Sequence, residues 1–180
     1  MGGVTASVAA LLLPGRANAT LLRGLPLSDL VWRSHHVVLL TGLDSRCRYF
    51  EIAGRRSIIT ETRLRVDDAI ARITPNSGEL VVRTLGGQID GEGELVHGQA
   101  EFVANAGCLA FLTRGRDDSL WVTGMAQGHY PLDNGSGSEA RLSASPHLPT
   151  IRDWDRSGVR VLAGQTVSEA RRLIVSARQP

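Results

Sequence analysis

The fold is decided by a stretch that opens with Glu79-Leu-Val-Val-Arg-Thr-Leu-Gly-Gly-Gln-Ile-Asp-Gly-Glu-Gly-Glu-Leu-Val-His-Gly98. Two apolar runs follow at Cys108–Leu112 and Leu120–Met125, separated by a polar turn at Arg114–Ser119, and a last short run ends at Leu132. Short β-type runs joined by glycine-rich connections are typical of a small closed β-structure. We therefore predict a mainly β protein built around this stretch.

Upstream of this stretch the sequence predicts a short helix and a buried strand. Pro26–Ser34 has one apolar side, and Ser28 is the expected N-cap of its helix. Val37–Gly42 is a continuous apolar run that ends at glycine, which favours a buried strand. We expect Tyr49–Ile52 to continue or return that strand after a turn at Asp44–Arg46.

The clearest alternation in the chain runs from Ile58 to Val66. Its even-numbered residues point to one side, the expected core, and the other side carries Glu61, Arg63 and Arg65. The chain is then expected to bend off at Asp67, turn at Pro75–Gly78 and return as a strand at Glu79–Leu85. Residues 86–107 hold six glycines and few apolar anchors, so we expect a long excursion there.

The carboxyl-terminal part reads as a linker and a helix. Asp133–Thr150 is rich in Ser, Gly, Pro and Asn, which is typical of a linker. A capping box at Thr166 and Glu169 opens a helix that is expected to span residues 166–177. We therefore predict a β domain at 20–132, a linker at 133–150 and an extension at 151–180. For the chain as a whole we predict a mainly β fold, a five-stranded OB-like, or roll-like, antiparallel barrel with an N-terminal and a C-terminal helix.

Residues 1–19 have the pattern of a signal peptide. An apolar run ends at Pro14-Gly15, and Ala17-Asn-Ala19 has the small-x-small form of a cleavage site. The expected mature chain begins at Thr20 and is exported, either to the periplasm or out of the cell. The apolar run is too short to span a bilayer as a mature helix.

Composition and motifs argue against several activities. The formal net charge is only +2, and all 20 basic residues are arginine. The sequence contains no phosphate loop, nucleophile elbow, His-Glu-x-x-His or Cys-x-x-Cys motif, so we expect no cofactor. The expected exposed face of Ile58–Val66 lacks the aromatic residues that single-strand nucleic-acid binders use for stacking, so no nucleic-acid partner is expected.

A few residues remain as candidates for a site. The glycine-rich excursion and its surroundings supply the candidate binding residues: Gly86, Gly87, Asp90, Glu92, His97 and His129. A metal site from His97 and His129 with Glu92 or Glu94 is the catalytic alternative. The spacing of Cys47 and Cys108 leaves open whether the two form a disulfide or stay as thiols.

Residues 26–132 resemble a group of uncharacterised exported bacterial proteins built on a short β-barrel. The resemblance is carried by an apolar strand that ends at Thr41-Gly42, by Val81-Val-Arg-Thr-Leu-Gly-Gly87, and by Gly124-Met-Ala-Gln-Gly128. It implies the barrel and export. A more remote similarity to the netrin-like modules of tissue inhibitors of metalloproteinases implies an OB barrel only. Their zinc-chelating amino-terminal cysteine has no counterpart in a chain that begins at Thr20.

Three functional hypotheses follow. The first is a non-enzymatic exported module that binds a protein or envelope component through the glycine-rich loop at 86–107. The second is a small secreted metal-dependent hydrolase that uses His97 and His129. The third is a protease-directed regulator, by the remote similarity to the inhibitors.

Overall fold

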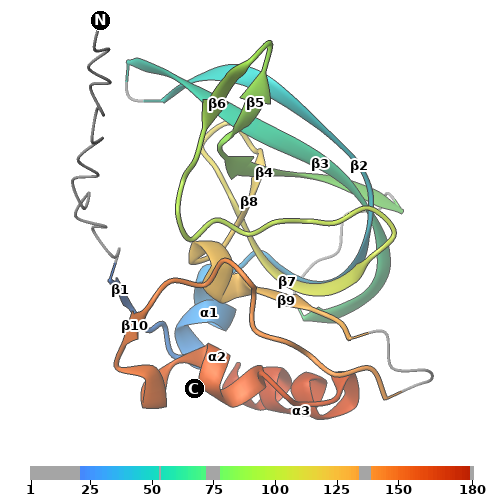
Figure 1. Cartoon of the computed structure of the whole chain (residues 1–180). Helices are drawn as coiled ribbons and strands as arrows, with labels where there is room; N and C mark the ends of the chain where they lie inside the picture. The colour runs from blue at the N-terminus through green and yellow to red at the C-terminus, as the bar shows by residue number, and fades with distance from the viewer. Residues whose placement is uncertain (1–20, 53, 72–77, 134–138, 179–180) are drawn as a thin grey trace, which may run out of the picture.

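The structure, a computed structural model, describes residues 21–52, 54–71, 78–133 and 139–178. The predicted signal peptide at 1–19, most of the predicted turn at 75–78 and part of the predicted linker lie outside these residues. In the described part, strands form a ring and helices lie beneath it (Figure 1). The chain is mainly β, as predicted.

Five strands hydrogen-bond in an order that returns to its first member, β2-β3-β4-β8-β7-β2. All their pairings are antiparallel except β4–β8, which is parallel. The strands of the ring are β2 (His36–Ile52), β3 (Arg55–Ala71), β4 (Glu79–Leu85), β7 (Gly107–Arg114) and β8 (Leu120–Val122). The predicted strand at 79–85 and the predicted hairpin across Asp117-Asp118 are thus confirmed.

The two longest strands differ from the prediction. The predicted turn at Asp44–Arg46 is wrong, because β2 continues through it and pairs with β3 up to Ile52. A bulge at Leu43 shifts the register without ending the strand, and Asp44, Ser45 and Arg46 each pair with a residue of β3. β3 likewise does not bend off at Asp67 but pairs on to Ala71. Hydrogen bonding between β2 and β3 along their whole length outweighs the weak local preference of these residues for a turn.

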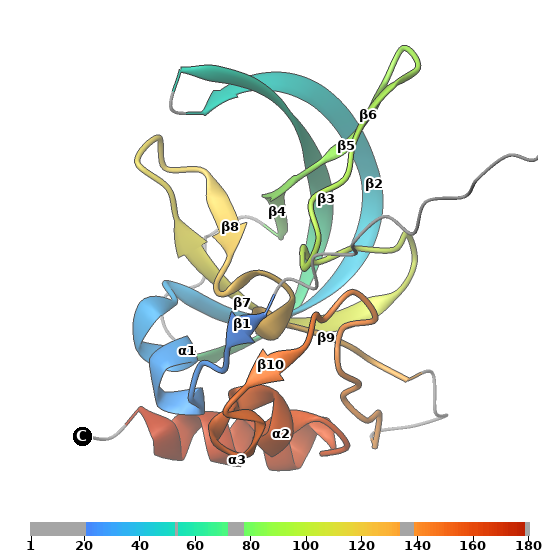
Figure 2. The ribbon, with the colours of Figure 1, turned by 60° about the vertical axis from the view of Figure 1, so that its left-hand side comes forward.

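The glycine-rich excursion contains a small hairpin. β5 (Gly87–Ile89) pairs antiparallel with β6 (Glu92–Glu94). The Tyr49 hydroxyl donates to Glu92 Oε2 at 2.6 Å, which ties this hairpin to β2. Figures 1 and 2 show the hairpin beside the upper part of the β2–β3 arch. After Glu94 the chain runs without regular strands to β7, as expected for an excursion.

The helices and short elements pack on one side of the ring (Figure 2). They are α1 (Leu27–Arg33), the 3-10 turns η1 (Met125–Gly128) and η2 (Trp154–Arg156), α2 (Gly158–Leu162), and α3 (Val167–Ala177). β9 (His129–Pro131) extends the sheet from β7, and β1 (Leu22–Arg23) pairs in parallel with β10 (Ile151–Arg152). No sequence pattern predicted α2, a short helix of five residues capped by Ser157.

The predicted terminal helices are confirmed, with one change in capping. Thr166 and Glu169 form the expected capping box of α3. The N-cap of α1 is Pro26 and not Ser28, which lies inside the helix. The described part of the predicted linker is not free, because Leu142 is buried in the core and pairs with Leu132. Although this segment is mostly polar, Leu142 and Leu148 both pack on the core.

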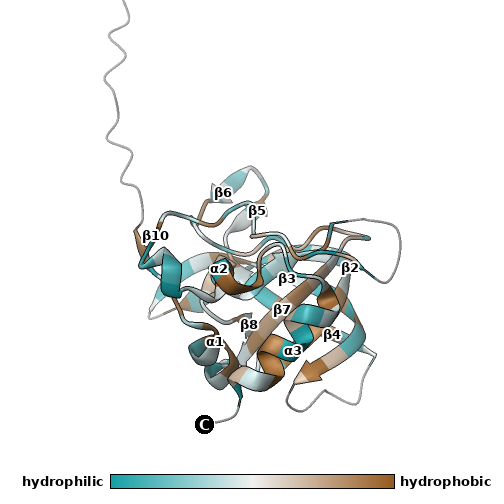
Figure 3. Ribbon diagram, turned by 90° about the horizontal axis from the view of Figure 1, so that it is seen from below, coloured by the Kyte–Doolittle hydropathy of each residue, from teal (hydrophilic) through white to brown (hydrophobic). Residues whose placement is uncertain are grey.

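Two hydrophobic cores hold the fold together. One lies between the outer side of β2, β3, β7 and β9 and the helices, and it includes Phe111, Tyr130 and Ile174. The other fills the ring interior and includes Leu40, Leu64 and Val82. β7 contributes to both cores, and Figure 3 shows it hydrophobic along most of its length above α3. A strand buried on both faces explains why Cys108–Leu112 is a continuous apolar run.

Among the described residues, no helix combines the length and apolarity that a membrane span requires.

Candidate functional site

The ring interior changes character along its length. Its closed end is apolar, with Leu64, Leu80 and Leu112 fully or nearly buried. Further along the same strands, the inward-facing positions carry hydroxyl groups, namely Ser45, Thr60, Thr62 and Thr84. The ring interior is therefore filled by apolar side chains at one end and lined by hydroxyl groups at the other.

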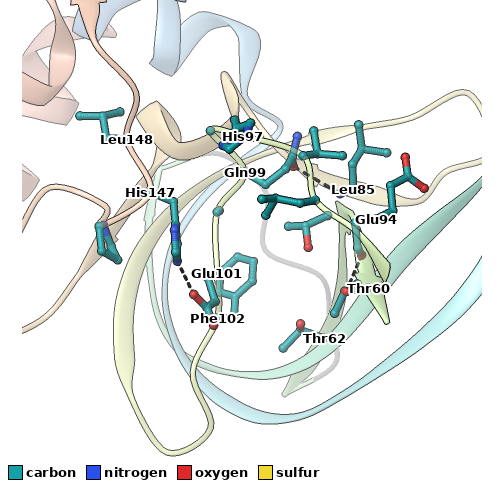
Figure 4. A pocket seen from close by; sticks show the side chains of 18 of the residues that line it. Thr60, Thr62, Leu85, Glu94, His97, Gln99, Glu101, Phe102, His147 and Leu148 are labelled. Atoms are coloured by element: carbon teal, nitrogen blue, oxygen red, sulfur yellow. Dashed lines mark hydrogen bonds and ion pairs between the residues drawn. The ribbon is translucent and has the colours of Figure 1, made fainter. Parts of the chain in front are cut away.

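The hydroxyl end of the ring opens into a cavity of about 640 Å³ (Figure 4). Residues 94–102 of the glycine-rich segment and residues 146–149 complete its wall. Small-molecule sites in proteins occupy roughly 300–1,000 Å³, so the cavity has the size of a ligand site. Phe102 and Leu148 supply apolar surface in the wall.

Two side chains fasten the 94–102 segment to the ring. Glu94 Oε2 accepts a hydrogen bond from the backbone N–H of Ile58 at 2.6 Å, and Gln99 Oε1 accepts one from the N–H of Leu85 at 3.4 Å. Both donors are backbone groups near the ends of β3 and β4, which would otherwise lack a partner strand there. These two hydrogen bonds fix the position of the segment over the cavity.

Two glycines make the turn from β4 into this segment. Gly86 and Gly87 have φ of 92° and 139°, values that L-residues rarely adopt. A Cβ on Gly87 would lie 2.6 Å from the sulfur of Cys47 and 2.8 Å from Thr60 Oγ1. The Thr60 hydroxyl also donates to the carbonyl of Gly86 at 2.8 Å. The pair of glycines is thus required for the close approach of β5 to the β2–β3 arch.

The ionisable groups of the cavity are acidic or imidazole. Glu101 pairs with His147 across the rim, from segments 46 residues apart (Figure 4). Glu94 and the exposed His97 complete the ionisable lining. Every basic residue of the chain apart from histidine is an arginine, and none of the described arginines lines the cavity. The cavity therefore offers hydrogen-bonding and negatively charged groups rather than an anion site.

The structure brings together only part of the predicted site. Gly86, Gly87 and His97 line the cavity. Asp90 lies at the tip of the β5–β6 hairpin with φ of 50°, and Glu92 faces Tyr49 and Arg56 outside the cavity. The inward-facing hydroxyls were not predicted as part of a site. The alternation of Ile58–Val66 indicated only that Thr60 and Thr62 face inward.

His129 is buried behind the cavity wall and does not line it. Its ring meets that of Phe102 edge to face, with centroids 4.9 Å apart, and Nδ1 lies 3.4 Å from Ser145 Oγ. Burial lowers the pKa of His129 to about 4, since the low-dielectric surroundings disfavour the imidazolium. Among the described residues no three His, Cys, Asp or Glu side chains converge as a metal site.

Both cysteines are free thiols, so the disulfide left open by the sequence is not formed. Cys108 pairs with Leu40, whereas Cys47 lies seven residues further along β2. Seven residues of strand span roughly 20 Å, well beyond the reach of a disulfide. Burial raises the pKa of the Cys108 thiol to about 12, with the negative charge of Asp67 adding to the effect.

A cluster on the outer face of the ring was also missed. Glu61 was expected to face water, but it is only 5% exposed and pairs with Arg46, Arg48 and Arg83. Burial opposes its ionisation, yet the hydrogen bonds from the three guanidinium groups outweigh it and lower the pKa of Glu61. Because the four residues come from three adjacent strands, no local sequence pattern predicts the cluster.

Phe50 lies under this cluster. The guanidinium carbons of Arg48 and Arg83 lie 5.3 and 5.2 Å from the centre of its ring. Both guanidiniums therefore make cation–π contacts with the aromatic ring of Phe50, and these contacts help to hold them in place.

No protein-family model matches the chain, and neither does any curated protein sequence. The resemblances described above therefore remain expectations from the residues that carry them.

Proposed function

We propose that the chain is an exported, non-enzymatic binding module that recognises a protein or envelope component through the glycine-rich segment at 86–107. The observation that carries this proposal is the cavity of about 640 Å³ at the open end of the ring, which that segment encloses. The same segment presents two exposed apolar side chains, Leu95 at 81% and Val103 at 58%. Leu95 also lines the cavity, so its exposed side chain lies where a bound partner would contact it.

The anchoring of the segment supports binding as its role. Because Glu94 and Gln99 fasten it to β3 and β4, little conformational entropy is lost when a ligand settles against it. Ser45 and Thr62 hydrogen-bond to one another at 2.9 Å, and the Thr60 hydroxyl bonds to the Gly86 carbonyl and lies 3.5 Å from Cys47 Sγ. No histidine among the described residues hydrogen-bonds to these hydroxyls, so they lack the adjacent base that a nucleophile needs.

The OB-like barrel belongs to the same proposal. A five-membered strand order that returns to its start, with one parallel pairing at β4–β8, supports a small barrel over an open roll. Such a barrel provides a rigid frame on which a variable segment can carry recognition.

The proposal is tested by site-specific photocrosslinking in the native host. A photoreactive phenylalanine analogue replaces Leu95 and, as a matched control, Val175, which is 46% exposed on α3. We expect a discrete adduct from position 95 and none from position 175. Leu95→Glu should prevent binding of the captured partner, since it sets a charge on the apolar contact. Equal labelling from both positions would refute recognition through this segment.

Export is tested by the intact mass of the protein recovered from fractions of the native host. We expect a mass that begins at Thr20, in the envelope or the medium. A full-length product in the cytoplasm would refute export while leaving the crosslinking result untouched.

A further inference from the structure

The ring has an edge that its own strands leave open. β2 pairs with β7 only from His36 to Thr41, and Gly42 then exchanges backbone hydrogen bonds with residues 105 and 106. Beyond Gly42, within the described chain, the backbone of β2 hydrogen-bonds to β3 alone. Residues 43–52 thus present one row of backbone donors and acceptors to the outside.

The closure of the ring stops at Gly42 for a steric reason. The carbonyl oxygen of Val103 would lie 2.2 Å from a Cβ at this position, so the chain crosses β2 in direct contact. Past the crossing, β2 and β3 arch away together, as Figure 2 shows at the top of the molecule. The open edge begins beside the cavity, since Ser45 is part of the cavity lining.

Alternation gives this edge two different faces. On the inner face lie Ser45 and Cys47, toward the cavity and β5. On the outer face lie Asp44, whose charge is paired with Arg63, and then Arg46 and Arg48. Arg46 has a side chain 79% exposed.

The outer face carries an excess of positive charge at this edge. Three guanidiniums, from Arg46, Arg48 and Arg83, share the single carboxylate of Glu61. Arg83 has a second partner in Asp117 at 2.5 Å. Among the described residues, the two arginines of β2 have no carboxylate other than Glu61 within salt-bridge distance. They can therefore donate hydrogen bonds to a carboxylate of another molecule.

We propose that the open edge of β2 receives an extended acidic segment of a partner protein as an added strand. This inference rests on the proposed function, because the inner side of the added strand borders the mouth of the cavity. Backbone hydrogen bonds to residues 43–52 provide the docking. Acidic side chains at alternate positions meet Arg46 and Arg48, and the side chains between them face the cavity.

The charges favour such a partner over a second copy of the chain. If two β2 edges paired antiparallel about Cys47, Arg46 of each copy would lie opposite Arg48 of the other. Like charges directly opposite one another destabilise a strand pair. In that register the arginines oppose self-association, whereas an acidic strand meets both of them with opposite charge.

The test uses three fluorescent peptides of about ten residues, long enough to span the edge. The first alternates glutamate and threonine, the second alternates lysine and threonine, and the third is the first with alternate backbone nitrogens methylated. By fluorescence anisotropy at low salt we expect the first to bind roughly tenfold or more tightly than the other two, and more weakly as salt rises. Binding should protect the amides of residues 43–52 from hydrogen exchange.

Arg46→Gln should weaken binding of the glutamate peptide roughly three- to tenfold, since an exposed guanidinium contributes one charge-assisted contact. Arg160→Gln, a matched exposed arginine on α2, should leave binding unchanged. Absence of binding, equal binding of the methylated peptide, or protection outside residues 43–52 would each overturn the proposal. So would a dimer in solution whose protected amides are those of residues 43–52.

The two proposals fail separately. Crosslinking from position 95 without peptide binding would leave the glycine-rich segment as the recognition site and exclude the strand addition. Peptide binding at residues 43–52 that survives Leu95→Glu, with no adduct from position 95, would establish the edge and exclude the segment.

Discussion

The two ends of the ring are made by the same strands and differ in nearly everything else. At the closed end, Leu64 of β3 and Val82 of β4 lie in a core without exposed surface. At the open end, two residues further along each strand, Thr62 and Thr84 face a cavity. On each strand, only two residues therefore separate the packed positions that stabilise the ring from the positions that face the cavity.

The two ends are stabilised by different interactions, which allows a small β protein to keep a cavity. The apolar end supplies packing, since each buried aliphatic side chain contributes about 1.5–3 kcal/mol relative to exposure. The open end is kept in shape by polar bonds instead, such as Glu94 to the Ile58 N–H and Thr60 to the Gly86 carbonyl. These bonds contribute less individually but specify geometry.

The largest contrast is expected from truncations two residues apart on β3. Leu64→Ala should destabilise the protein by about 2–5 kcal/mol, because it removes buried methyl groups and leaves a cavity in a closed core. Thr62→Ala should cost only about 1 kcal/mol, the value of its hydrogen bond to Ser45. Urea unfolding followed by circular dichroism measures both. Equal losses would show that the two ends are not energetically distinct.

The outer face offers the next contrast, between a buried and an exposed carboxylate. Glu61→Gln should cost about 3 kcal/mol, because it leaves three guanidiniums around a neutral amide. Asp44→Asn, which breaks the exposed pair with Arg63, should cost less than about 1 kcal/mol. The same urea experiment applies. A small loss for Glu61→Gln would mean that solvent screens the cluster.

The region behind the cavity wall should make stability depend on pH through His129. Its pKa in the folded protein is lowered to about 4 from 6.5, so the unfolded chain binds more protons as pH falls below about 6.5. Its contribution is therefore fully present above pH 6.5 and is lost as pH falls toward 4. The loss between pH 7 and pH 5 is about 2 kcal/mol.

The measurement is urea unfolding at both pH values in the parent chain and in His129→Gln. The variant should lose about 2 kcal/mol less over this interval. His97→Gln, which changes an exposed histidine that does not act on His129, serves as the control and should behave like the parent. An unchanged pH dependence in His129→Gln would contradict the assignment.

The smallest effect is expected from the turn that joins the open end to the glycine-rich segment. Thr60→Val removes the bond to the Gly86 carbonyl and should cost about 1 kcal/mol of global stability. Hydrogen exchange should rise locally at residues 86–94 while the closed end keeps its protection. Thr41→Val, which removes an exposed bond to Asp67, is the control and should leave residues 86–94 unchanged.

Much of the fold could be predicted from local pattern. The alternation of Ile58–Val66, the run at Glu79–Leu85 and the capping box at Thr166 each encode a structure that nearby residues decide. Turn chemistry at Asp44–Arg46 misled, because a long partner strand outweighs a weak local preference for a turn. The candidate site was predicted only in part, since Gly86, Gly87 and His97 line the cavity whereas His129 lies behind its wall.

The mainly β fold class, the places of most strands and the terminal helices follow from periodicity and capping within a few residues, so they can be predicted locally. The strand order of the ring, the burial of Glu61 among arginines from β2 and β4, and the open edge beyond Gly42 became visible only in the folded chain. Those features arise from pairings between residues far apart in the chain. Their energy depends on which strands meet, and no local pattern records that choice.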